Sequence, residues 1–167
     1  TLQPINKLEV DAAILFSDIL VIPEALGQPY HFRDGGGIGM DFILETKEQI
    51  EALDEKNTGD KLLYMGKALE SIRAEMGMDK ALLGFGGSPL TLAAYMTEGG
   101  SLKNCSRLKH LFYEDRALFE TLMDKVTTAV IDLFKMQIAH GADALQLFDS
   151  AGAFCSACDY HEMSVKW

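Results

Sequence analysis

The sequence predicts an α/β fold made of parallel βα units. Three short apolar segments, at Asp11–Phe16, Ala81–Phe85 and Asp143–Ser150, have the length and composition of strands. Helical patterns separate them, and such crossovers allow neighbouring strands to run parallel. Each segment is followed by polar or glycine residues, as in the active-site loops of (β/α)8 barrels. Because three units cannot close a barrel of eight, we expect a partial (β/α)8, TIM-type barrel with about three βα units.

The first apolar run is continuous through Phe16, which predicts a strand buried on both faces. Asp18 follows it directly, and a carboxylate at the end of a buried strand is costly to desolvate unless a partner binds it. One interpretation is that Asp18 holds a loop amide or caps a helix. The other is that it is a catalytic or ligand-binding carboxylate. We expect Ser17–Ala25 to form a turn and the glycine-rich segment Gly27–Gly39 to be a loop.

Helices are expected at four further places, each with its own signal. The predicted helices are Thr46–Leu53 with Thr46 as its cap, Lys61–Met76 ended by Gly77, Leu90–Met96, and Asp115–Ala139 ended by His140-Gly141. In the longest of them we expect one buried seam, made of Leu118, Leu122, Val126, Val130, Phe134 and Ile138. A last helix begins near Ser156.

Composition narrows the class of protein. The chain has 167 residues, 48% of them hydrophobic, and a formal net charge of −10. That charge argues against nucleic acid or an anionic membrane surface as a partner. Three cysteines are too few for a disulfide framework and favour a reducing, cytoplasmic setting. Both ends of the sequence look truncated, so we interpret residues 1–167 as a single, incomplete domain that is an internal piece of a longer barrel.

Three sequence motifs at the strand ends are more specific than the strand and helix patterns. They are DAAILFSDILVIPEALG at Asp11–Gly27, GFGGSPLTLAAYMTEGG at Gly84–Gly100, and GADALQLFDS at Gly141–Ser150. Together, in this order, they resemble the uroporphyrinogen decarboxylase family of haem biosynthesis. The resemblance implies a homodimeric TIM-type barrel that removes CO2 from the four acetate side chains of a tetrapyrrole, without metal or organic cofactor.

The same resemblance implies roles for five residues. Asp18 matches the family's central aspartate and Tyr95 its active-site tyrosine, while Ser150 matches a serine that contacts substrate. Phe85 and Gly87 match positions that line the pocket. The family's arginine-rich motif and a late histidine have no counterpart in this sequence, so we expect the isolated chain to be inactive.

The segment after Ser150 allows a different hypothesis. Cys155, Cys158 and His161 are three residues apart, so on one helix they would share a face, and thiolate and imidazole are good zinc ligands. Zinc- and corrinoid-dependent methyltransferases belong to the same superfamily. A zinc site and methyl transfer are therefore the alternative function. A non-catalytic, tetrapyrrole-binding paralogue is the third.

Overall fold

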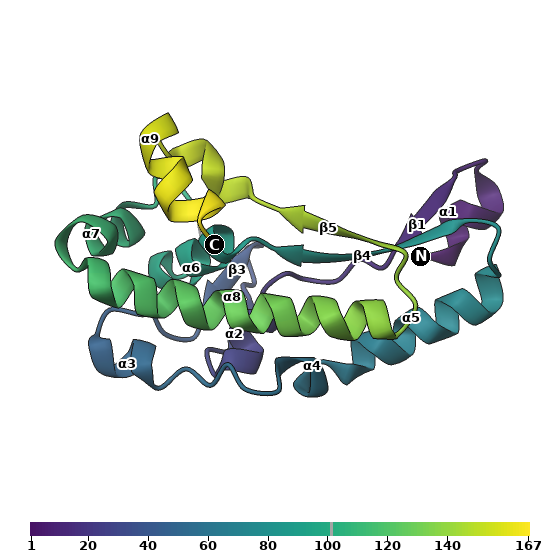
Figure 1. The fold of residues 1–167 in the computed structure, drawn as a ribbon, viewed down its shortest axis with the longest axis horizontal. Coiled ribbons are helices and arrows are strands. Elements are labelled where there is room, and N and C mark those ends of the chain that lie inside the picture. Colours follow the sequence, from purple (N-terminus) through teal and green to yellow (C-terminus); the bar gives the residue numbers. More distant parts are fainter. Residues whose placement is uncertain (101) are drawn as a thin grey trace.

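A computed structural model describes residues 1–100 and 102–167 of the chain (Figure 1). The strands are β1 (Ala12–Ile14), β2 (Tyr30–Phe32), β3 (Ile38–Met40), β4 (Ala81–Gly87) and β5 (Ala144–Phe148). The α-helices are α1 (Leu2–Lys7), α2 (Val21–Leu26), α3 (Lys47–Glu51), α4 (Thr58–Lys61), α5 (Leu63–Met76), α6 (Pro89–Glu98), α7 (Ser106–Glu114), α8 (Arg116–Ala139) and α9 (Ala157–Tyr160). A 3-10 helix, Ser150–Phe154, follows β5, and a π-helix, His161–Val165, follows α9. Among the described helices, none is both long and apolar enough to cross a bilayer.

A three-stranded parallel sheet forms the centre of the fold, with the order β1-β4-β5. The register pairs Ile14 with Leu83 and Gly87 with Phe148. Helix crossovers connect the strands, so the predicted arrangement of about three parallel βα units is confirmed. All three strands end at the same edge, and the segments that follow them therefore meet there.

Helix α8 runs beside the sheet and packs on β4 (Figure 1). Two glycines of β4 permit this close approach: a β-carbon at Gly84 would lie 2.0 Å from Oε1 of Gln137, and one at Gly86 would lie 2.7 Å from the Phe134 ring. The fully buried Gln137 side chain accepts a hydrogen bond from the amide of Phe85 at 2.8 Å and donates one to its carbonyl at 2.8 Å. This side chain fixes the register of α8 against β4.

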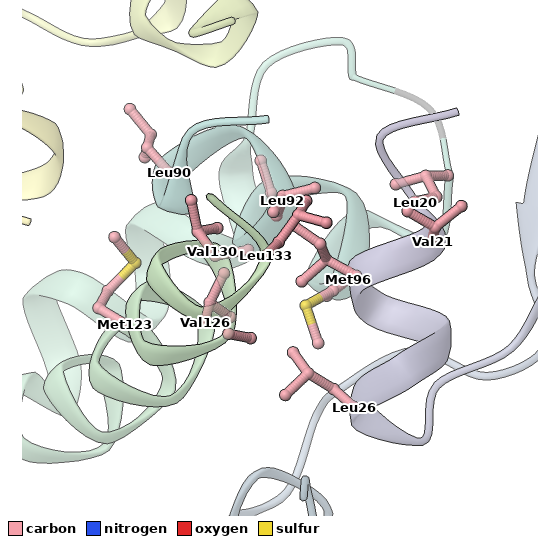
Figure 2. Packing of buried hydrophobic residues seen from close by; sticks show 14 of the residues in the cluster. Leu20, Val21, Leu26, Leu90, Leu92, Met96, Met123, Val126, Val130 and Leu133 are labelled. Carbon is pink, nitrogen blue, oxygen red and sulfur yellow. The ribbon is translucent and has the colours of Figure 1, made fainter. Parts of the chain in front are cut away.

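The predicted seam of α8 is partly wrong, because Ile138 is 58% exposed. A strict spacing of four residues turns about 40° too far at each step, since a residue advances the helix by about 100°. After five steps the line has moved round the helix, and Leu133, Met136 and Gln137 take the buried positions instead. Figure 2 shows how Val126, Val130 and Leu133 of α8 pack beside apolar residues of α6 and α2, among them Leu92, Met96 and Leu26.

Two segments predicted as a turn and a loop contain regular structure. Val21–Leu26 is a helix, and its Pro23 lies in the first turn, where a backbone N–H has no helical partner to lose. The glycine-rich segment is the antiparallel hairpin β2–β3, in which Gly36 and Gly37 have positive φ and close the turn. Both segments lie beside the edge where the parallel strands end.

The first strand is shorter and less covered than predicted. It ends at Ile14, and Phe16 is 73% exposed. The Phe16 ring lies on the sheet face opposite α8, where it stacks on Phe85 with centroids 5.5 Å apart. The segment that was predicted to be buried on both faces is therefore exposed at Phe16.

Candidate active site

A cavity of about 530 Å³ opens at the edge where the parallel strands end. Its lining comes from the segment after β1, the β2–β3 hairpin, helix α6 and the end of β5. The residues are Phe16, Ser17, Asp18, Ile19, Leu20, Phe32, Ile38, Tyr95, Phe148 and Ser150. The structure thus brings Asp18, Tyr95 and Ser150, which come from three distant parts of the sequence, to one cavity.

Asp18 is half-buried in the loop between β1 and α2. Its Oδ1 atom accepts a hydrogen bond from the backbone N–H of Leu20 at 2.8 Å. The prediction that this carboxylate holds a loop amide is therefore confirmed, and the same side chain also lines the cavity. One oxygen orients the carboxylate, which leaves lone pairs of the group available to a ligand.

Tyr95 lies on α6 and is half-buried. Burial raises the pKa of its phenol, and the charge of Asp18 raises it further. The hydroxyl therefore stays protonated near neutral pH and can donate a hydrogen bond next to a carboxylate. The phenol of Tyr30, on the hairpin, has its pKa raised by the same two causes in the same order.

Three phenylalanines form apolar walls around this pair. Phe16, Phe32 and Phe148 all line the cavity, although the first two are more than 70% exposed. Exposed aromatic rings around a concave site are typical of surfaces that bind a ligand. In the described part of the chain, no lysine, arginine or histidine lines the cavity.

Phe85 and Gly87 lie beneath the cavity and are not among its lining residues. Phe85 is fully buried and supports the Phe16 ring from below. A β-carbon at Gly87 would approach the side chains of Leu92 and Ile19 to 2.9 and 3.2 Å, so this glycine lets α6 and the segment after β1 pack closely. That either residue contacts substrate stays a prediction.

Sequence reasoning missed a hydrogen-bond network under one wall of the cavity. Asp149 accepts hydrogen bonds from the hydroxyls of Ser88, Thr91 and Ser164 at 2.6, 3.1 and 2.7 Å. A serine followed by proline indicates the start of α6 in the sequence. In the structure, Ser88 caps this helix by accepting a hydrogen bond from the backbone N–H of Thr91. Nothing in the sequence links that cap to an aspartate 61 residues away.

Comparison with known proteins identifies the family. The model of a family described as uroporphyrinogen decarboxylase (URO-D) matches residues 1–167, the whole chain. The chain belongs to the uroporphyrinogen decarboxylase family.

Curated relatives named uroporphyrinogen decarboxylase include those of Shewanella amazonensis, 42% identical, and Ruthia magnifica, 40% identical, each over all of this chain. The match takes in 47% and 48% of these relatives, so the chain spans about half of their length. Among solved structures, a methyltransferase from Methanosarcina mazei superposes with a TM-score of 0.70 and 19% identity, over 91% of this chain and 44% of that one. At this identity the likeness shows a shared fold alone.

The cysteine segment does not have the shape that the zinc alternative assumes. Cys155 has an extended backbone and precedes α9, so Cys155, Cys158 and His161 do not share a helix face. The Cys155 thiol points to the sulfur of Met163 at 3.9 Å, whereas Cys158 and His161 are exposed. In residues 1–100 and 102–167, no three His, Cys, Asp or Glu side chains are close enough together to hold a metal ion.

Proposed function

We propose that the full-length protein is a uroporphyrinogen decarboxylase, which removes CO2 from the acetate side chains of uroporphyrinogen to give coproporphyrinogen. One observation carries the proposal: a fixed carboxylate, a protonated phenol and three aromatic rings converge on one cavity at the ends of parallel strands. The relatives' printed name supports the substrate.

The chemistry explains why these residue types suit that substrate. A porphyrinogen presents four pyrrole N–H donors toward its centre, and an ionised Asp18 accepts several of them. Protonation of a pyrrole carbon gives a cationic ring. The electron pair of the breaking C–C bond then enters this ring as CO2 leaves. A proton added to the resulting methylene carbon, with loss of the ring proton, leaves a methyl group and the neutral pyrrole.

Asp18 stabilises the positive charge that develops in this ring, because a preorganised carboxylate in a desolvated site needs no rearrangement during the reaction. Tyr95 donates a hydrogen bond from its hydroxyl to Asp18 or to a substrate carboxylate, and Ser150 does the same from the end of β5. The rings of Phe16, Phe32 and Phe148 cover the faces of the macrocycle and exclude water. On this mechanism the substrate acts as its own electron sink, and no cofactor takes part.

Several finer predictions belong to the same proposal. They are closure of the βα units into a complete (β/α)8 barrel, of which residues 1–167 are one incomplete domain, a homodimeric full-length enzyme, and a cytoplasmic setting. Cations that neutralise the substrate's carboxylates come from outside this chain, since the described cavity lining has none. The isolated 167-residue chain is therefore expected to show no decarboxylation.

The decisive experiment measures turnover of uroporphyrinogen by the full-length protein and its Asp18→Asn variant. Loss of the charge is expected to lower kcat by about 10²- to 10³-fold, as for other preorganised groups. Asp11→Asn is the matched control, because Asp11 is an exposed aspartate immediately before the start of β1, at the opposite end of this strand from Asp18. Equal turnover by wild type and Asp18→Asn would contradict the mechanism. An inactive wild type that still binds the tetrapyrrole would indicate the non-catalytic paralogue.

A further inference from the structure

Asp149 lies at the end of β5, between Phe148 and Ser150, which both line the cavity. Its own side chain turns away from the cavity and is half-buried. Oδ1 accepts from the hydroxyls of Ser88 and Thr91, and Oδ2 accepts from the hydroxyl of Ser164. Both oxygens are thus bound by the protein and neither faces a ligand.

These contacts connect two walls of the cavity. Ser88 and Thr91 form the start of α6, and Tyr95 lies one helical turn beyond Thr91 on the same helix. Thr91 also accepts a hydrogen bond from the amide of Ala151 at 3.0 Å, and the amide of Ser88 donates to the carbonyl of Phe148 at 2.8 Å. The start of α6 and the end of β5 are therefore joined by four hydrogen bonds, two of which end on the Asp149 carboxylate.

The charge state of Asp149 agrees with this arrangement. Burial alone raises the pKa of the carboxyl, but hydrogen bonds from Ser88, Ser164, Tyr160 and Thr91 outweigh it and hold the pKa below its usual range. An ionised carboxylate accepts short, strong hydrogen bonds from hydroxyls. Its negative charge also lies next to the positive end of α6, which stabilises both.

We infer that Asp149 is a positioning residue: it holds α6, and with it the phenol of Tyr95, at a fixed place relative to Asp18 and to the β5 wall. The inference rests on the proposed function only where turnover is the readout. Since misplacement of a reacting group by about 1 Å costs up to about 100-fold in rate, an anchor one helical turn from Tyr95 has a measurable effect on catalysis.

The first measurement is steady-state kinetics of the full-length protein. Asp149→Asn retains the shape of the side chain and one acceptor, but removes the charge and the second acceptor. We expect kcat to fall about 10- to 100-fold while KM stays within about 3-fold, because positioning of Tyr95 matters most in the transition state. Asp124→Asn, at an exposed position of α8, is the matched control and is expected to behave as wild type.

The second measurement does not depend on activity. 3-Fluorotyrosine is placed at position 95 of the full-length protein, and its ¹⁹F resonance reports the surroundings of the phenol. Asp149→Asn is expected to shift or split this resonance, and Asp124→Asn to leave it unchanged. Should Asp149→Asn fail to fold, Thr91→Val replaces it, because it removes one contact to the carboxylate and one to Ala151 without changing side-chain size.

The two measurements separate this inference from the proposed function. A moved resonance in a protein whose wild type does not decarboxylate uroporphyrinogen supports the positioning role and contradicts the function. An active wild type whose resonance does not change on Asp149→Asn overturns the positioning role, whether or not kcat falls. A purely structural residue would lower the melting temperature and leave both kcat of the folded protein and the resonance unchanged, which overturns it too.

Discussion

Gly84→Ala provides the sharpest test of how α8 is fixed on the sheet. The added β-carbon would lie 2.0 Å from Oε1 of Gln137, a distance that no real contact allows. The Gln137 amide must then leave Phe85, and its two buried hydrogen bonds, both of 2.8 Å, are lost. Two such bonds contribute about 2 kcal/mol net, and the buried groups left unpaired add about 1–3 kcal/mol. We expect the free energy of unfolding to fall by about 3–5 kcal/mol.

The assay is urea unfolding of the full-length protein, followed by circular dichroism. Gly35→Ala is the control, since a β-carbon there meets nothing within 4 Å and the residue is exposed; its expected effect is within about 0.5 kcal/mol. A double-mutant cycle adds Gln137→Ala. If the two residues compete for the same space, the double variant loses at least about 1 kcal/mol less than the sum of the single variants. Additive effects, or a cost of Gly84→Ala below about 1 kcal/mol, would refute the reasoning.

Three further predictions concern a thiol, a carboxylate and a glycine. Burial raises the pKa of Cys105 to about 11, so at pH 8 only about 0.1% of it is thiolate, and a maleimide should label the exposed Cys158 far faster in a thiol-mapping experiment. Because the pKa of Asp149 is lowered on folding, it stabilises the fold above its unfolded value near pH 4, and this contribution disappears as the pH falls through the lower folded value. The stability advantage of wild type over Asp149→Asn, from urea midpoints between pH 6 and 2.5, should therefore shrink below about pH 4. Gly100→Ala should lower the melting temperature, since its β-carbon would lie 2.5 Å from the carbonyl oxygen of Ile38 at a φ of +106°; an unchanged value would contradict this packing.

Local patterns predicted the three parallel strands and the helices α3, α5, α6, α8 and α9, because each carries its own signal. The apolar runs before Asp18 and Ser150, and the caps at Thr46 and Gly77, depend only on neighbouring residues. Pro23 misled the prediction of α2, since a proline in the first turn and a proline that breaks a helix look alike in sequence.

The cavity was predicted less completely than the strands. Asp18, Tyr95 and Ser150 were found because the motifs around them resemble a known family and each follows a strand. The contributions of Phe32 and Ile38 were missed, because they depend on the hairpin lying over the strand ends, a long-range arrangement without a local signal. The partners of Asp149 were missed for the same reason: the hydroxyls of Ser88 and Thr91, at the start of α6, and that of Ser164, in the π-helix, meet only in the folded chain.

The β2–β3 hairpin is hydrogen-bonded to the end of α6. The carbonyl of Gly99, at the end of α6, accepts hydrogen bonds from the amide of Met40 and from Arg33, and Gly100 lies against the backbone of Ile38. Tyr95 is on the same helix, so α6 positions both the hairpin, which lines the cavity with Phe32 and Ile38, and the Tyr95 phenol. To exchange the β2–β3 hairpin between relatives, the Gly99-Gly100 turn must be exchanged with it. Otherwise the new hairpin will also displace the Tyr95 phenol.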